Sequence, residues 1–297
     1  MEYQLSLFDV PVQTVQKKTN WLVIDGNNLL NRCYYATANN PRGLLRAPDG
    51  RYTNAVSLFL KMMLNYEKSL QAKTVVMFDK GKSYRKEIYP AYKEGRNDTP
   101  EPLEEQFPLI QEILMKADIP IYMDTQYEAD DFIASFAERA TGHVYVLSND
   151  RDVFQLISDK VTIIVRKGKE DVFMTPEQFN IDFEGLTPMQ IVDLKALSGD
   201  SSDNIPGVKG IGEPGALKLL KEFGTLERMI DAEAFPQHLN RYKGKLQDGK
   251  EDAVFFKKLT TLHRDIPMDI RETELDKKEL IKYCEILQIK SIRALLS

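Results

Sequence analysis

Nine carboxylates occur in five short clusters, and four of these clusters lie at or just beyond the end of an apolar run typical of a β-strand. They are Asp25, Asp79, Glu128 with Asp130 and Asp131, Asp150 with Asp152, and Asp200 with Asp203. In an α/β sheet, ligand sites form outside the carboxyl ends of the strands. Carboxylates gathered there repel one another unless cations hold them, and oxygen ligands without His or Cys favour Mg²⁺ or Mn²⁺. The first hypothesis is a metal-dependent enzyme that acts on phosphodiesters.

Helix capping is the simpler alternative for each cluster taken alone, because acidic residues stabilise helix N-termini. Capping needs one acid at each helix start, however, and three of the clusters carry a pair or a triple. The joint pattern therefore favours metal binding.

The stretch 80–96 carries six basic and two acidic residues, with three tyrosines among them. Basic residues neutralise phosphates, and aromatic faces stack on unpaired bases. Because the stretch follows Asp79 directly, we expect it to emerge beside the metal site. A solvated basic loop whose tyrosines pack inward is the alternative.

A glycine-rich segment, GDSSDNIPGVKGIGEPG, lies within residues 199–224. Gly207, Gly210 and Gly212 permit tight turns with exposed backbone N–H groups, which bind phosphates as helix N-termini do. With Lys209 between them, the pattern indicates a helix-hairpin-helix contact to the DNA backbone. A plain helix–turn–helix connection does not need three glycines in six residues.

Alternating strand and helix signals predict the elements that position these residues. Strands are expected at 21–25, 74–79, 119–124, 143–150 and 160–168, and helices at 54–70, 102–117, 128–140 and 152–157. This alternation predicts an α/β fold with a mostly parallel central sheet flanked by helices. We divide the chain into a flexible leader (1–19), a catalytic core (20–180) and a helical C-terminal region (181–297).

Length and composition limit the possible classes of protein less sharply. The chain has 297 residues and a formal net charge of -5. It has no apolar run near the ~20 residues that cross a bilayer, and no signal-peptide core. Two cysteines make no disulfide framework, so a reducing cytoplasm is expected. We expect a monomer that is a stand-alone protein or an isolated domain, since no second region is large enough for a polymerase.

Five motifs appear in order: VIDGNNLLNR, FDKGKSYRKE with YKEGR, YEADD, SNDRDVFQL, and GDSSDNIPGVKGIG. Together they resemble the 5′-nuclease family, which includes the 5′–3′ exonuclease domain of bacterial DNA polymerase I and the bacterial and phage flap endonucleases. The resemblance covers roughly residues 20–290. It implies a SAF/PIN-like nuclease core, a helical arch at about 80–110, and a helix-three-turn-helix element at about 186–224 that grips duplex DNA through K⁺.

Carried over position by position, the resemblance implies a site with two Mg²⁺ ions, for which Mn²⁺ substitutes. It places Asp25, Asp79, Glu128 and Asp130 at the first ion and Asp150, Asp152 and Asp203 at the second. Asp131 falls between them and Asp200 close by. The catalytic set it implies is Asp25, Asp79, Asp130, Asp131, Lys93 and Arg96. The DNA contacts it implies are Lys82, Arg85, Tyr92 stacked on a base, Lys93, Arg96, Gly207, Lys209, Gly210 and Gly212. Pro214-Gly215 departs from the Lys-Thr of many relatives, which puts one phosphate contact in doubt.

The implied function is a structure-specific 5′ nuclease that hydrolyses phosphodiesters near single-strand/double-strand junctions by two-metal-ion catalysis. Its expected substrates are 5′ flaps, pseudo-Y structures, nicked duplexes and RNA primers paired to DNA, in replication and repair in a bacterial nucleoid or a phage-infected cell. Two alternatives stay open. One is a non-hydrolytic module that binds branched DNA, and the other is an RNA-directed nuclease of the wider superfamily, whose chains are shorter and lack GVKGIG.

The leader contains one further signal. Gln4-Leu5-Ser6-Leu7-Phe8 resembles the short peptide by which bacterial replication proteins bind the sliding clamp. In such a peptide Leu5, Leu7 and Phe8 enter an apolar pocket while Gln4 bonds at its rim. The alternative is that these residues pack back on the core.

Overall fold

A computed structural model describes residues 18–41 and 43–296, and within them one six-stranded sheet has the order β3-β2-β1-β4-β5-β6. The strands are β1 (Asn20–Asp25), β2 (Ala72–Met77), β3 (Ile121–Tyr122), β4 (Val144–Leu147), β5 (Val161–Lys167) and β6 (Glu170–Met174). All neighbours pair in parallel except β5 and β6, which are antiparallel. The expected mostly parallel sheet is confirmed, whereas β6 was not expected.

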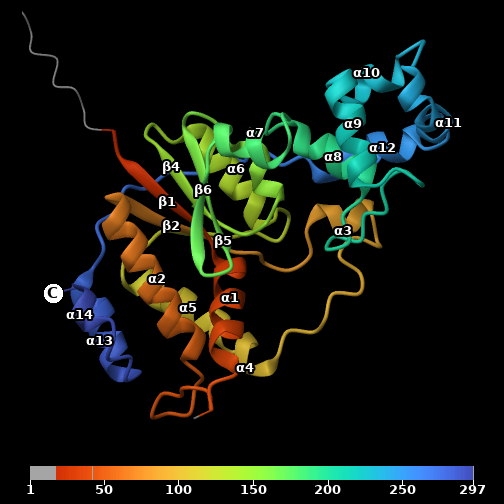
Figure 1. The fold of residues 1–297 in the computed structure, drawn as a ribbon. Coiled ribbons are helices and arrows are strands. Elements are labelled where there is room, and N and C mark those ends of the chain that lie inside the picture. The colour runs from red at the N-terminus through yellow and green to blue at the C-terminus, as the bar shows by residue number, and fades with distance from the viewer. Residues whose placement is uncertain (1–17, 42, 297) are drawn as a thin grey trace, which may run out of the picture.

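Both faces of the central strands are buried, as in parallel sheets covered by helices on each side. Trp21 and Val23 belong to one hydrophobic core, and Leu22 and Ile24 to the other. Helices α1 (Gly26–Ala38), α2 (Asn54–Leu70) and α5 (Gln106–Lys116) contribute to the second core, and α6 (Ala129–Arg139) to the first. Figure 1 shows α2 and α5 below the sheet and α6 above it.

The strand order changes direction between β1 and β4. From β1 the chain adds β2 and β3 on one side, and then returns to add β4 and β5 on the other. The carboxyl ends of strands at such a switch point border a crevice where ligands bind in open α/β sheets. Asp25 ends β1, and residues 148–150 follow β4, so the topology brings acid clusters from distant parts of the sequence to one edge.

The chain after β6 is helical. Its elements are α7 (Pro176–Asp182), α8 (Gln190–Ser198), α9 (Glu213–Phe223), α10 (Leu226–Ile230), the short helix η2 (Gln237–Leu239), α11 (Asn240–Asp248), α12 (Lys250–Thr260), α13 (Lys277–Ile286) and α14 (Arg293–Leu296). Helices α8 to α12 project beyond one end of the sheet, whereas α13 and α14 return to α5 and α2 (Figure 1).

The segment after β2 differs from the expected helical arch. It contains one five-residue helix, α3 (Tyr84–Ile88), continues through turns to Gly95, and reaches a four-residue helix, α4 (Glu101–Glu104). We call residues 80–100 the span. The expected helix at 152–157 is a short 3₁₀ helix, η1 (Asp152–Leu156).

No helix in the described ranges combines the length and the apolar character that crossing a bilayer requires. The predicted clamp-binding peptide lies outside the described residues.

Candidate active site

Two of the predicted acids are oriented by the backbone at the carboxyl ends of neighbouring strands. Asp25 caps α1, where its Oδ1 accepts from the Asn28 backbone N–H at 3.0 Å and its Oδ2 accepts from the Ser148 hydroxyl at 2.8 Å. Asp79 follows β2, and its Oδ1 accepts from the Ala129 N–H at 2.7 Å. The N-terminus of α6 thereby holds Asp79 beside Glu128 and Asp130.

Asp130, Asp150 and Asp152 form the centre of the acidic group, since one oxygen of each lies within 4.8 Å of the others. Oδ1 of Asp130 is buried and has no hydrogen-bond partner. Burial, reinforced by the charges of Asp150 and Asp25, raises the pKa of Asp130 well above its usual value. Burial likewise raises the pKa of Asp25 to about 7. A buried carboxylate oxygen without a donor, among other carboxylates, fits a divalent cation that such oxygens would ligate.

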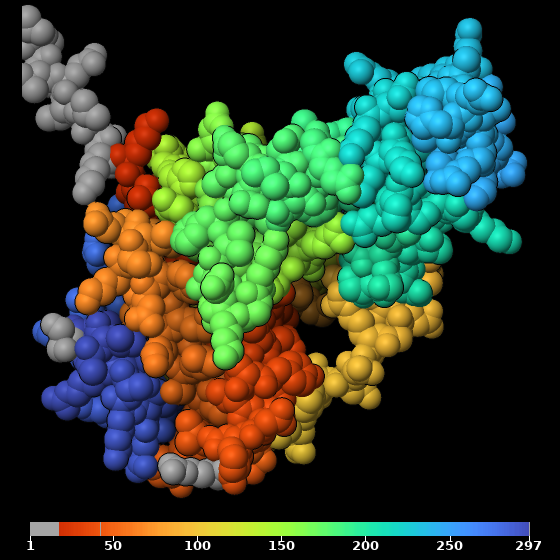
Figure 2. Space-filling model, viewed as in Figure 1, coloured from red at the N-terminus to blue at the C-terminus, as the bar shows by residue number. Residues whose placement is uncertain are grey.

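A cavity of about 510 Å³ passes between these acids and the span. Asp25, Asp79, Asp130 and Asp150 are among its lining residues, as are Lys93 and Arg96 of the span. In Figure 2 an opening separates the red helix α1 from the dark-yellow segment that leads from α3 toward α4. The span thus crosses over the acidic group and leaves a passage beneath it.

Lys93 and Arg96 connect the span to the acids. Lys93 Nζ lies 2.8 Å from Glu128 Oε1, and its backbone has a φ of 55°, which is uncommon for a residue with a side chain. Burial favours the neutral amine, but Glu128, Asp203 and Asp79 raise the pKa of Lys93, so the ammonium form persists. Arg96 Nη2 lies 2.8 Å from Asp203 Oδ1. Both cations therefore line the cavity, and their contacts with phosphate stay predictions.

Lys195 of α8 was missed by the sequence reasoning. Its buried ammonium group pairs with Asp152 and lies 2.6 Å from Asp200 Oδ2. The neighbouring carboxylates, acting against burial, raise the pKa of Lys195. A lysine within the apolar run IVDLKAL was the available signal, because a charge on a buried helix needs a partner.

Two predictions about charged residues are wrong. Arg85 was expected to contact DNA, but it is 2% exposed and binds Asp131 through two nitrogens at 2.6 and 2.8 Å. Asp131 was expected among the metal ligands and catalytic acids, but it is fully buried and both its oxygens accept from Arg85. Arg85 and Asp131 form a buried ion pair, and neither side chain lines the cavity.

Tyr92 was expected to stack on a base, and this prediction is also wrong. Its side chain is 3% exposed, and its hydroxyl lies 3.0 Å from both Glu128 Oε2 and Asp203 Oδ2. Burial and these two carboxylates raise the pKa of Tyr92. The phenol bridges acids that were assigned to different ions and does not present its ring to a ligand.

The predicted hairpin connects α8 to α9. Gly207 has a φ of 65°, and a Cβ there would lie 2.3 Å from the Gly199 backbone nitrogen, so only glycine fits. Lys245 of α11 donates to the Gly210 carbonyl at 2.9 Å. Gly212 is the N-cap of α9, and Lys209 is exposed, as is Lys82 in the span. Their DNA contacts stay predictions.

The structure explains why a glycine stands at position 215. A Cβ at this position would lie 2.9 Å from the Tyr242 hydroxyl, so the small residue makes room for a ring of α11. Glycine at this position therefore lets the Tyr242 ring pack directly against α9.

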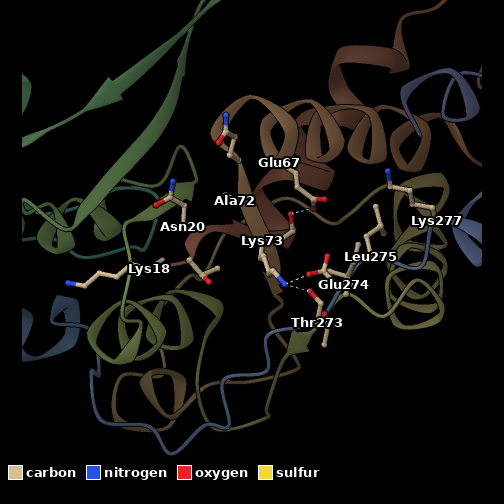
Figure 3. A pocket seen from close by; sticks show the side chains of 13 residues that line it. Lys18, Asn20, Glu67, Ala72, Lys73, Thr273, Glu274, Leu275 and Lys277 are labelled. Atoms are coloured by element: carbon tan, nitrogen blue, oxygen red, sulfur yellow. Dashed lines mark hydrogen bonds and ion pairs between the residues drawn. The ribbon is translucent and has the colours of Figure 1, made fainter. Parts of the chain in front are cut away.

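A second hollow, of about 370 Å³, lies at the amino ends of β1 and β2, at the opposite edge of the sheet. Figure 3 shows Lys73 there, bonded to Thr273 and Glu274. None of the predicted acids lines it, so it is separate from the candidate active site.

Comparison with known proteins gives matches over nearly the whole described chain. The family model "5'-3' exonuclease, N-terminal resolvase-like domain" matches residues 20–184, and "5'-3' exonuclease, C-terminal SAM fold" matches residues 186–282. The chain is 43% identical to DNA polymerase I of Bacillus caldotenax over 85% of its own length and 29% of that protein. It is 36% identical to a 5'-3' exonuclease of Halalkalibacterium halodurans over 82% of its own length and 84% of that protein.

Solved structures share the fold. The T5 D15 protein co-crystallised with metal ions aligns over 94% of this chain and all of that one, with a TM-score of 0.65 and 23% identity. Flap endonuclease-1 from Methanococcus jannaschii aligns over 94% of this chain and 91% of that one, with a TM-score of 0.62 and 16% identity. The chain spans less than a third of the DNA polymerase I relatives that it matches.

Proposed function

Because this chain belongs to the 5′–3′ exonuclease family, we propose that it is a structure-specific 5′ nuclease that hydrolyses DNA phosphodiesters near single-strand/double-strand junctions. The observation that carries the proposal is the group formed by Asp130, Asp150 and Asp152, in which a buried oxygen of Asp130 has no donor. A DNA-binding module without hydrolytic activity would have no need for this uncompensated charge.

We propose two sets of ligands. Asp25, Asp79, Glu128 and Asp130 would hold one divalent cation, and Asp150, Asp152 and Asp203 a second, with Asp200 beside them. When bound, Mg²⁺ or Mn²⁺ supplies positive charge against the scissile phosphate and makes the attacking water more acidic. The buried Asp130 oxygen without a partner supports this proposal, because such a cation would compensate its charge.

Lys93 is the residue that we propose for the phosphate itself. Its ammonium group sits at the cavity and pairs with Glu128. When DNA binds, this group can donate to a non-bridging phosphate oxygen and stabilise the charge that grows there during attack. Arg96, which is half exposed, is placed to bind the neighbouring phosphate.

The passage beneath the span supports selection of a free 5′ end. We propose that a single strand, and not a duplex, enters the opening that the acids line together with Lys93 and Arg96. We propose that the α8–α9 hairpin binds the duplex beside the junction through Gly207, Lys209, Gly210 and Gly212. We also propose that K⁺ binds at this hairpin when duplex DNA is bound. Lys245 donates a hydrogen bond to the Gly210 carbonyl of the hairpin.

Cleavage of a 5′-labelled flap in Mg²⁺ tests the proposal. The wild type should cut near the junction, and Asp130→Asn should reduce kcat by roughly 10²-fold or more, because the cavity loses a central anionic ligand. Asp269→Asn is the matched control, since its side chain is 82% exposed. Flap binding without cutting by the wild type, in Mg²⁺ and in Mn²⁺, would instead indicate a non-hydrolytic module.

The cellular setting is part of the proposal. The bacterial polymerase and exonuclease relatives support a role in replication or repair in a bacterial cytoplasm, with flaps, nicked duplexes and primed strands as substrates. Residues 4–8 are proposed to bind a sliding clamp. Leu7→Ala with Phe8→Ala should then abolish clamp binding and leave cutting of free flaps unchanged.

A further inference from the structure

Arg85 is a fully buried cation that the proposed chemistry does not use. Besides the two bonds to Asp131, its Nη1 lies 3.2 Å from Glu128 Oε2. Its Nε donates to the Leu259 carbonyl at 2.8 Å, and its Nη2 to the Thr261 carbonyl at 3.4 Å. Every nitrogen of the guanidinium group therefore has a partner.

Asp131 completes a junction between three segments. Its Oδ1 also accepts from the His263 N–H at 2.9 Å, and its Oδ2 from the Glu128 N–H at 3.2 Å. Arg85 lies in α3 at the base of the span, Asp131 in the first turn of α6, and residues 259–263 at the end of α12. Segments far apart in the sequence are thus fastened at one buried point.

Glu128 links this junction to the cavity. Arg85 approaches its Oε2, while Lys93 and the Ser83 hydroxyl bind its Oε1 at 2.8 and 3.0 Å. Arg85 and Lys93 are both in the span and hold the same carboxylate from two sides. The placement of Lys93 over the acids therefore depends on how α3 is anchored.

We propose that Arg85, through its buried pair with Asp131, is a positioning residue that keeps Lys93 and Glu128 aligned across the cavity. A contribution to stability alone is a weak explanation, because buried ion pairs often add little compared with apolar replacements. The planar guanidinium group supplies several donors in fixed directions, which lysine cannot reproduce. This inference rests on the proposed nuclease function.

Two variants separate positioning from stability. Arg85→Lys keeps the charge but loses most of the donors. Arg85→Met with Asp131→Asn removes both charges and keeps an oxygen that can accept from the His263 N–H. Arg293→Lys is the matched control, since Arg293 pairs with Glu285 on the surface at 3.0 Å. For each we would measure Tm, flap affinity in EDTA by fluorescence anisotropy, and kcat and KM for flap cutting in Mg²⁺.

Positioning predicts that kcat falls roughly 10- to 100-fold in both variants, while flap affinity in EDTA and KM stay close to those of the wild type. Arg293→Lys should match the wild type throughout. A normal kcat in Arg85→Lys, with only Tm lowered, would overturn the inference, and that variant decides the matter if the double variant does not fold. Failure of the wild type to cut would count against the proposed function instead.

Discussion

At the scale of single residues, the protein compensates some of its acids with its own cations and leaves others uncompensated. Glu128 pairs with Lys93, Asp203 with Arg96, and Asp200 with Lys195. Asp130, in the middle, has an oxygen without any partner. Acids without a cationic partner therefore include the centre of the group, where a divalent cation would supply the missing positive charge.

Lys93→Ala should lower kcat for flap cutting by roughly 10²–10³-fold, because one charge that stabilises the transition state is lost. Flap affinity in EDTA should change much less, since several other cations contact the backbone. Single-turnover kinetics at saturating enzyme would measure the effect. Lys169→Ala, an exposed lysine in the β5–β6 turn, is the control, and equal rates for the two variants would remove Lys93 from the chemistry.

At the scale of elements, the span and the α8–α9 hairpin depend on side chains from other helices. The span is anchored by α6 and the end of α12, and the hairpin by Lys245 of α11. The proposed binding surfaces are thus loops that helical elements hold in place, which would reduce the ordering required when DNA binds.

Gly207→Ala should destabilise the protein by at least about 2 kcal/mol, because the new Cβ meets backbone atoms at a positive φ. The affinity of this variant for duplex DNA should also fall, because the hairpin is distorted. Gly244→Ala is the matched control: this glycine lies in α11 with open space around a Cβ, and alanine there should stabilise by up to about 1 kcal/mol. Chemical denaturation of both would show the contrast, and equal stabilities would mean that the hairpin adopts another backbone.

Lys245→Met should weaken binding to nicked duplex by about fivefold, which corresponds to the roughly 1 kcal/mol of one hydrogen bond, while Tm changes little. Lys243→Met is a close control, because Lys243 also donates to a carbonyl, that of Glu233, at 2.7 Å. Binding isotherms in EDTA would compare them. An equal loss of duplex affinity in both variants would indicate that the positive charge matters in general, and that the Lys245 hydrogen bond does not specifically stabilise the hairpin.

At the scale of the whole molecule, the acidic group couples stability to pH and to metal. Burial raises the pKa values of Asp25 and Asp152 to about 7. Between about pH 4 and 7 the folded state therefore binds protons that the unfolded state releases, so the metal-free protein loses stability as pH rises through this range.

In EDTA, Tm should accordingly be higher at about pH 5.5 than at about pH 8, and Mg²⁺ should raise Tm mainly at the higher pH, because cations replace the missing protons. Asp130→Asn should raise Tm in EDTA at about pH 8 and reduce the response to Mg²⁺. Differential scanning fluorimetry would follow both. A Tm in EDTA that did not change between the two pH values would show that the acids are already compensated.

The types of residue at the cavity edge of the sheet could be predicted from the local sequence pattern. Apolar runs that end in acids predict parallel strands whose carboxyl ends share one edge, so Asp25, Asp79, Asp130 and Asp150 were expected together, and all four line the cavity. Glycines at 207 and 210 similarly predicted backbone that other residues cannot adopt, because a positive φ is a local property.

The directions in which the side chains around this group face could be read only from the folded structure. Arg85 and Tyr92 are residue types of a DNA-binding surface, yet Arg85 is buried against α6 and the end of α12, and Tyr92 against Glu128 and Asp203. Asp131 turns inward one residue from Asp130, which faces the cavity. Lys195 enters the acidic group from a helix more than forty residues beyond Asp150. Local sequence specifies charge and backbone preference, whereas the direction of a side chain and its partner depend on the packing of segments far apart in the chain.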